Sequence, residues 1–145
     1  MGFRFTLASV LRFRESIEER EELALKKVEF ELARVRRRID ELTQELAKAS
    51  DERDAALQKS MEAFRLKNWQ DEMNASSETK QILVETLATL KSQRDAQMLL
   101  YQAARVNRRT LTDLQKQQQG LWEQEQVRIE QKQLDDIFSS RLQRS

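Results

Sequence analysis

The sequence has no cysteine, no proline and no histidine, and only two of its 145 residues are glycine. The lack of cysteine excludes disulfide bonds and thiolate chemistry. The lack of histidine removes the commonest general base and a frequent metal ligand. Interior proline and glycine both destabilise helices, so their scarcity is typical of long uninterrupted helices. The sequence also contains no apolar run long enough to cross a bilayer.

These absences argue against a catalytic or metal-binding site. The sequence has no glycine-rich phosphate loop and cannot form a pair of a nucleophile with a histidine base. The neighbouring carboxylates of Asp135 and Asp136 would point about 100° apart on a helix, which is unsuited to sharing one ligand. We therefore predict a protein that is not an enzyme and that uses no cofactor, no metal and no small-molecule substrate.

What the sequence does contain is a heptad repeat of apolar residues. Charged residues make up 35% of the chain, while the formal net charge is only +1. Among them, apolar side chains recur in alternating steps of three and four at Leu25, Val28, Leu32, Val35, Ile39, Leu42, Leu46 and Ala49. Such spacing is typical of the a/d seam of a coiled coil. A second stripe includes Leu83, Leu87, Leu90, Tyr101, Ala104, Leu111 and Leu114. The sequence therefore predicts an all-α protein.

A cluster of residues that favour helix N-caps separates the two stripes. Asn74, Ser76 and Ser77 precede Glu78, whose charge suits the first turn of a helix. We therefore predict a single coiled-coil domain over residues 1–145. It would have one helix over about 5–67, a turn over about 68–77 and a second helix over about 78–142. Two nearly equal arms around one turn indicate an antiparallel hairpin.

Equal arms also predict which residues face each other. In this register Glu18 would meet Arg128, and Leu42 would meet Ala104. At the end of the hairpin away from the turn, an apolar cluster on the second arm would cover a matching cluster on the first. The predicted contacts join Leu134, Ile137 and Phe138 to Leu7, Val10 and Leu11.

Arginines form the most conspicuous charge feature. The same register would place one group on each arm at a single level, as a basic belt of Arg34, Arg36, Arg37, Arg38, Arg105, Arg108 and Arg109. The belt would be either a solvated surface that neighbouring carboxylates partly neutralise, or a contact for an acidic surface. Nucleic acid is not the partner we predict, because the net charge is near zero and basic residues do not alternate with a platform of aromatic ones.

The stripe that follows the predicted turn is more apolar than the arm predicted to face it. Leu83, Leu87 and Leu90 would lie opposite polar residues such as Lys59. Two interpretations remain open. The stripe packs into the seam, or part of it stays exposed and binds a partner helix or groove.

Two segments near the ends of the sequence have a distinctive pattern, namely residues 3–19, which read "FRFTLASVLRFRESIEE", and residues 128–141, which read "RIEQKQLDDIFSSR". They resemble the FliJ family, coiled-coil proteins of the bacterial flagellar type III export apparatus. The first segment is similar to the family's opening, in which aromatic and basic residues alternate before a basic and acidic run. The second segment is similar to its closing pattern of charged and amide residues around an apolar cluster. The resemblance covers essentially the whole chain.

The resemblance implies a two-helix coiled coil similar to the central stalk of rotary ATPases. It implies three partners, namely a hexameric export ATPase, a membrane export-gate protein and export chaperones. It also implies a cytoplasmic location with peripheral association to the inner membrane. By this analogy the ATPase ring would be contacted by Leu7, Leu11, Arg14, Lys132, Leu134, Asp135, Asp136, Ile137 and Phe138. The export gate would be contacted by Leu83, Leu87, Leu90 and Arg94.

Two other functions fit the same architecture. One is the stalk of an injectisome, a type III secretion machine with a similar layout. The other is a generic coiled-coil scaffold, including an intermolecular dimer. A parallel dimer requires one continuous helix, and the cap-forming residues between Asn74 and Ser77 argue against it.

Overall fold

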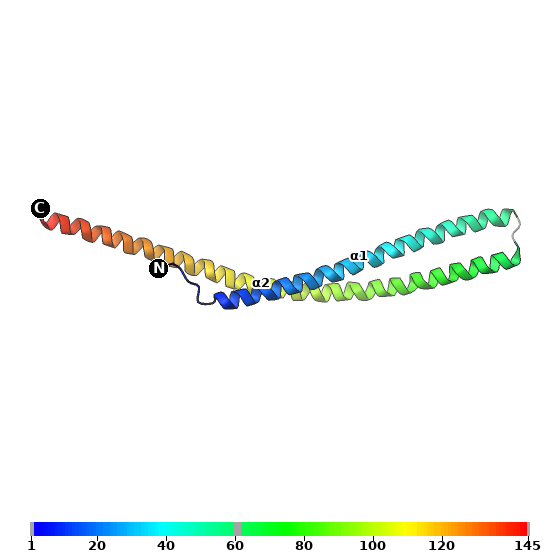
Figure 1. Ribbon diagram of the computed structural model, residues 1–145, viewed down its shortest axis with the longest axis horizontal. Coiled ribbons are helices and arrows are strands. Elements are labelled where there is room, and N and C mark those ends of the chain that lie inside the picture. The colour runs from blue at the N-terminus through cyan, green and yellow to red at the C-terminus, as the bar shows by residue number, and fades with distance from the viewer. Residues whose placement is uncertain (1, 60–61, 145) are drawn as a thin grey trace. The chain divides into compact units, whose positions relative to one another are not determined.

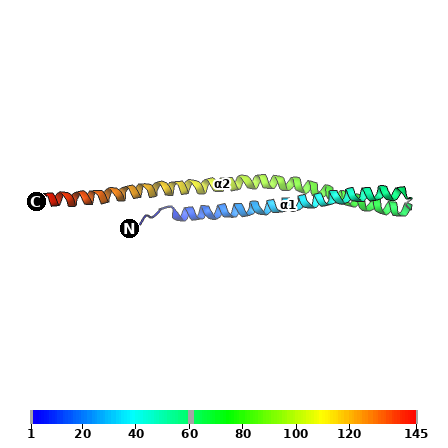
Figure 2. The ribbon, with the colours of Figure 1, turned by 90° about the horizontal axis from the view of Figure 1, so that it is seen from above.

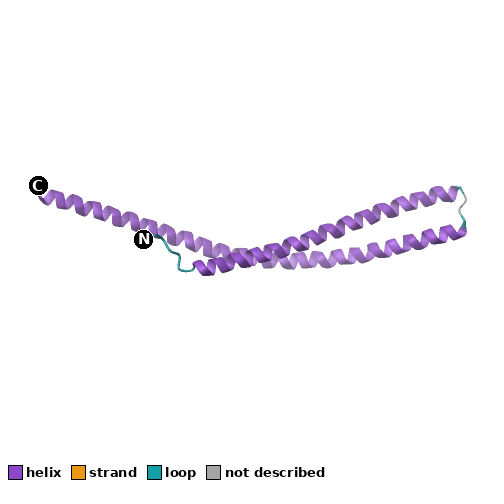
Figure 3. Ribbon diagram, viewed as in Figure 1, coloured by secondary structure: helices purple, strands orange, loops and turns teal. Residues whose placement is uncertain are grey.

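Two long helices make up nearly all of the chain in the computed structural model, which describes residues 2–59 and 62–144. Helix α1 spans Ala8–Gln58 and helix α2 spans Ala63–Arg144 (Figure 1). The two run antiparallel as a helical hairpin, and the described part of the chain contains no strand (Figure 3). The predicted all-α, antiparallel coiled-coil fold is confirmed.

Contacts within the chain group into two compact units. One unit combines residues up to Glu21 with residues from Tyr101 onward, and the other contains Glu22–Leu100. The second unit, which we call the turn unit, holds most of α1, the connection and the first part of α2. The first unit, which we call the terminal unit, holds the start of α1 and the rest of α2. Each is described separately below.

In the turn unit, the predicted heptad seam of α1 is the buried stripe. Leu25, Leu32, Val35 and Leu42 are buried, with exposed fractions between 3% and 7%. The other four seam positions, Val28, Ile39, Leu46 and Ala49, are half-buried. The core is therefore one line of side chains between two helices, so each residue on it carries a large share of the apolar burial.

The connection between the helices lies earlier than predicted. Helix α2 begins at Ala63, so the predicted turn over about 68–77 is helical and that prediction is wrong. The helix predicted over about 5–67 ends at Gln58, and the second helix is correspondingly longer. Near the connection, the backbone amide of Lys59 donates a hydrogen bond to the carbonyl oxygen of Ala56 at 3.1 Å. Residues 60 and 61 lie outside the described part.

The early start of α2 has a physical explanation in its own heptad repeat. Steps of three and four continue backwards from Leu83, and each side chain on them is half-buried, namely Lys80, Ser76, Met73, Trp69 and Leu66. An N-cap contributes only about 1 kcal/mol, less than burying large apolar side chains such as Trp69 and Met73. Asn74 also gains a partner inside the helix, because its Oδ1 accepts a hydrogen bond from Gln70 Nε2 at 3.0 Å.

In the terminal unit, the start of α1 packs on the middle of α2. Phe5 and Leu11 from the first arm and Ala104 from the second are buried, at 5%, 7% and 5% exposed. The rings of Phe3 and Trp122 lie 6.2 Å apart between centroids. The residues that precede α1 therefore sit at the level of Trp122, and the register differs from the predicted one.

Beyond this level α2 continues as a single helix, which Figure 2 shows at the red end of the ribbon. Every residue from Val127 to Arg144 is exposed. We call residues 127–144 the distal segment. At 1.5 Å per residue its length is about 27 Å. The predicted cover of Leu7, Val10 and Leu11 by Leu134, Ile137 and Phe138 is wrong, because those three side chains are 66%, 53% and 65% exposed.

Candidate functional site

The distal segment carries a cluster of exposed apolar side chains. Leu134 and Phe138 are four residues apart and so share one face of the helix, with Ile137 beside them. Together with Asp135 and Arg141 these side chains border a surface groove of about 350 Å³. Large apolar side chains grouped on an exposed helix are typical of a surface that binds another protein.

The apolar face of the distal segment does not continue the seam with α1. Gln118 and Trp122 are half-buried and mark the seam of α2. At about 100° per residue, Leu134 and Phe138 lie roughly 160° around the helix from those two positions. Lengthening α1 along its seam would therefore leave this face uncovered. It is a second surface, separate from the one that holds the hairpin together.

The nine residues predicted to contact an ATPase ring fall into two groups in the terminal unit. Leu11 is buried, and Leu7 and Arg14 are half-buried against α2. The other six, namely Lys132, Leu134, Asp135, Asp136, Ile137 and Phe138, are exposed on the distal segment. The level of Phe3 against Trp122 separates the groups by more than two turns of helix. The structure therefore does not bring all nine together.

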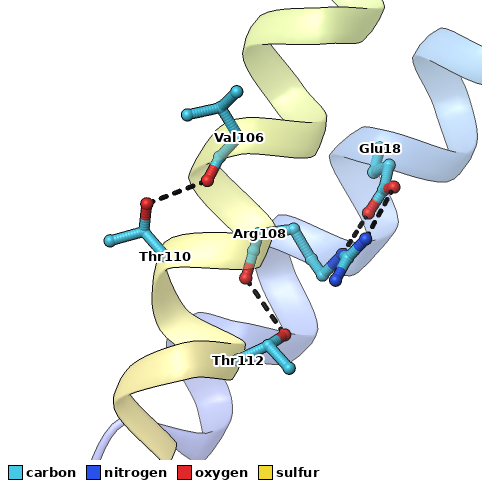
Figure 4. Close-up of polar contacts among 5 residues, drawn as sticks. All are labelled: Glu18, Val106, Arg108, Thr110 and Thr112. Atoms are coloured by element: carbon cyan, nitrogen blue, oxygen red, sulfur yellow. Dashed lines mark hydrogen bonds and ion pairs between the residues drawn. The ribbon is translucent and has the colours of Figure 1, made fainter.

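An ion pair at the seam defines the register of the terminal unit. Arg108 reaches across from α2, and its Nε and Nη2 donate to the two carboxylate oxygens of Glu18 at 2.6 and 3.3 Å (Figure 4). Their side chains are only 25% and 16% exposed. A two-pronged arginine–carboxylate contact has strict geometry, so it specifies alignment as well as adding energy. Glu18 thus meets Arg108, and the predicted pairing with Arg128 is wrong.

The pair shifts the pKa of both partners. The hydrogen bonds from Arg108 lower the pKa of Glu18, and the charges of Arg108, Arg105 and Arg109 act in the same direction, although burial opposes them. The hydrogen bond to Glu18 raises the pKa of Arg108. Both groups are therefore held in their charged forms.

The seven arginines of the predicted belt have different surroundings. Arg108 lies in the seam, whereas Arg105 and Arg109 are exposed in the terminal unit. The other four, namely Arg34, Arg36, Arg37 and Arg38, are exposed in the turn unit. In the turn unit Arg53 Nη1 lies 3.4 Å from Gln70 Oε1, and this register places Arg34–Arg38 opposite the 80s of α2. The two groups of arginines thus belong to separate units, and the single belt stays a prediction.

The four residues predicted to contact an export gate lie in the seam of the turn unit. Leu83, Leu87, Leu90 and Arg94 are all half-buried, at steps of four, three and four. Their neighbours Ile82 and Val84 are more open, at 61% and 41% exposed. Packing into the seam is thus the observed role of the leucines, while the edge of the stripe remains accessible beside them.

A second cluster, which the sequence analysis did not identify, lies near the connection. The guanidinium carbon of Arg53 is 5.0 Å from the centre of the Trp69 ring, within the range of a cation–π contact. Trp69 also lines a small hollow of about 140 Å³ with Leu46, Ala49, Met73 and Ser76, bordered by Glu45 and Glu72. The signal for this cluster is the heptad spacing of Trp69 and Met73, which becomes visible once the stripe of α2 is followed backwards.

Residues 2–59 and 62–144 contain no group of three or more carboxylates arranged to hold a metal ion. In the same residues, neither helix has the length and apolarity that crossing a membrane requires.

Comparison with known proteins identifies one relationship. The family model described as "Flagellar FliJ protein" matches residues 3–145, which is essentially the full length. Comparisons with curated proteins and with solved structures give no match. A match of this extent includes both segments quoted above, the start of α1 and the distal segment. The chain therefore belongs to the FliJ family and is a component of the bacterial flagellar export apparatus.

Proposed function

We propose that the protein is a non-enzymatic stalk for the hexameric flagellar export ATPase. In this role it promotes assembly and activity of the ring, and it links the ring to the membrane export gate and to export chaperones. It would work in the cytoplasm, at the inner membrane where the apparatus is anchored. Family membership supports the machine, and the fold of two long antiparallel helices is compatible with the role of a stalk within it.

The distal segment is the observation that carries the proposed contact with the ring. It offers Leu134, Ile137 and Phe138 on a single exposed helix, next to Asp135 and Asp136. Apolar side chains flanked by charges give both affinity and orientation in a protein interface. Because Leu7 and Leu11 pack on α2, we now assign them to holding the hairpin together and assign contact with the ring to the distal segment.

Stimulation of the cognate export ATPase tests this assignment. Wild-type protein should raise the rate of ATP hydrolysis, and Leu134→Ala with Phe138→Ala should lose most of that effect. A matched control is Leu100→Ala with Phe64→Ala, because these side chains are 55% and 72% exposed elsewhere on α2. Absence of stimulation by the wild type would refute the function. Equal loss with the control pair would refute the site.

For the export gate we propose the accessible edge of the stripe formed by Leu83, Leu87, Leu90 and Arg94. The leucines are half-buried, so substituting them changes both the seam and any partner contact. Arg94 offers a cleaner test, because its Nη2 is paired with its neighbour Asp95 at 3.1 Å and makes no ion pair that bridges the described parts of α1 and α2. Arg94→Gln should weaken capture of the purified gate protein and leave the melting temperature unchanged. Unchanged capture would remove Arg94 from the interface.

A further inference from the structure

Near its start in the turn unit, the outer face of α1 combines basic and apolar residues, and acidic residues return on this face from Asp40 onward. Between residues 23 and 37, the heptad positions farthest from the seam are occupied by Leu23, Lys26, Lys27, Phe30, Ala33, Arg34 and Arg37. All seven are exposed. Phe30, at 70% exposed, is the most exposed large apolar side chain of this part of α1. We call these seven residues the basic ridge.

The arrangement within the basic ridge is ordered. Leu23, Phe30 and Arg37 are seven residues apart and form its crest, which points directly away from the seam. Lys26 and Ala33 lie on one side of the crest, and Lys27 and Arg34 lie on the other. Two large apolar side chains thus stand on the crest, and long basic side chains flank them on both sides.

The basic side chains of the ridge can exchange their present weak ion pairs for contacts with a partner. Lys26 and Arg34 pair with Glu22 and Glu31 at 3.3 and 2.8 Å, on the same helix. In both pairs the side chains are between 44% and 68% exposed, and such pairs contribute little stability. Lys27 and Arg37 make no ion pair within the part of the chain that the structure describes.

We propose that the basic ridge binds an anionic membrane surface, with Phe30 and Leu23 entering the interface and the flanking lysines and arginines contacting lipid phosphates. Long basic side chains place their charge at the headgroups while their stems lie along apolar surface. A helix with this mixture lies in the plane of the membrane and does not cross it. Attraction to anionic lipid adds to the apolar term.

The shape of the ridge favours a bilayer over an acidic protein. Its crest is the convex outer line of one helix, and the two surface hollows described above lie elsewhere, near Trp69 and on the distal segment. A convex line with regularly spaced charges fits a deformable planar surface, whereas a protein partner recognises a helix by enclosing it in a groove. This inference is independent of the proposed stalk function, since it needs neither the ATPase nor the distal segment.

Flotation of the purified full chain with lipid vesicles tests the proposal. One set contains phosphatidylcholine alone, and the other contains phosphatidylglycerol and phosphatidylcholine in equal parts. The wild type should float with the anionic vesicles only, and less so at high salt, because salt screens the attraction. Each basic residue near such a surface contributes roughly a five-fold factor in partitioning, so Lys27→Gln with Arg37→Gln should weaken binding roughly 25-fold. Phe30→Ser should weaken it further.

Matched variants make the outcome specific. Lys91→Gln with Lys116→Gln removes the same charge from exposed positions on α2, and Phe64→Ser removes an equally exposed aromatic. These variants should float as the wild type does. Failure of the wild type to bind anionic vesicles, or equal losses in ridge and control variants, would overturn the proposal. So would ridge variants that bind vesicles normally but fail to bind the purified ATPase or gate, since the ridge would then recognise an acidic protein.

Discussion

The exposed cluster on the distal segment gives the most discriminating stability experiment. Replacing Leu134, Ile137 and Phe138 by alanine removes three large side chains that are between 53% and 66% exposed. Exposed substitutions of this kind change stability little, and alanine favours the helix. We therefore expect the triple variant to lose less than about 1 kcal/mol of unfolding free energy.

The opposite expectation holds if these residues cover the start of α1. Each truncation would then cost about 2–3 kcal/mol, and the triple variant would lose about 6–9 kcal/mol, which is comparable with the whole stability of a typical domain. A positive control is Leu11→Ala, because Leu11 is 7% exposed. It removes three buried carbons at about 0.8 kcal/mol each, about 2.4 kcal/mol in all.

Urea and thermal unfolding, followed by circular dichroism at the helix signal, measure both quantities. The control should lower the melting temperature by about 5–10 °C, while the triple variant should melt close to the wild type. A triple variant that is less stable than Leu11→Ala would refute the packing described for the terminal unit. So would a Leu11→Ala variant that is as stable as the wild type.

Three further predictions concern the seam. Because the pKa of Glu18 is lowered in the folded protein, ionised Glu18 stabilises the fold at pH values above its ordinary pKa of 4.5. This stabilisation is lost as the pH falls towards the folded-state pKa. Glu18→Gln should therefore flatten the acid limb of a stability–pH profile. Arg108→Glu and Glu18→Arg should each destabilise the hairpin, and the double exchange should restore most of the loss in a double-mutant cycle, whereas additive losses would place the two residues apart. Leu32→Ala, at a position 4% exposed, should cost about 2 kcal/mol in urea unfolding, and Leu99→Ala, at a position 68% exposed, less than about 0.5 kcal/mol; equal costs would contradict the seam.

The heptad seam of α1 was predictable because its signal is dense and purely apolar. From Leu25 to Ala49 every step is three or four, and no polar residue interrupts the pattern. The position of the connection was not predictable in the same way. Residues near Lys59 include no proline or glycine, whereas Asn74, Ser76 and Ser77 offer the stronger local signal for a helix start. Tertiary packing of Trp69 and Met73 outweighed that local preference.

The predicted register depended on where the connection lies, so the misplaced turn assigned wrong partners to several residues. With equal arms, Glu18 faces Arg128, and with the observed start of α2 it faces Arg108. The sequence did hold a clue to the correct pairing. Glu18 and Arg108 both fall on seam positions of their stripes, and opposite charges at apolar positions stabilise the fold only when they face each other. The proposed contacts of the distal segment depend on the surface of a second protein, which this sequence does not describe.

The unequal lengths of the helices, 51 and 82 residues, give the terminal unit a change in thickness. A single helix with its side chains is about 10–12 Å across, and two packed helices lie 8–10 Å apart between their axes, so the paired region is about 20 Å in its wide direction. An opening wide enough for one helix but not for two would admit the distal segment. It would not admit the paired region that begins at the level of Phe3 and Trp122. If the distal segment enters the ring as proposed, the level of Phe3 and Trp122 marks the depth at which two packed helices replace one.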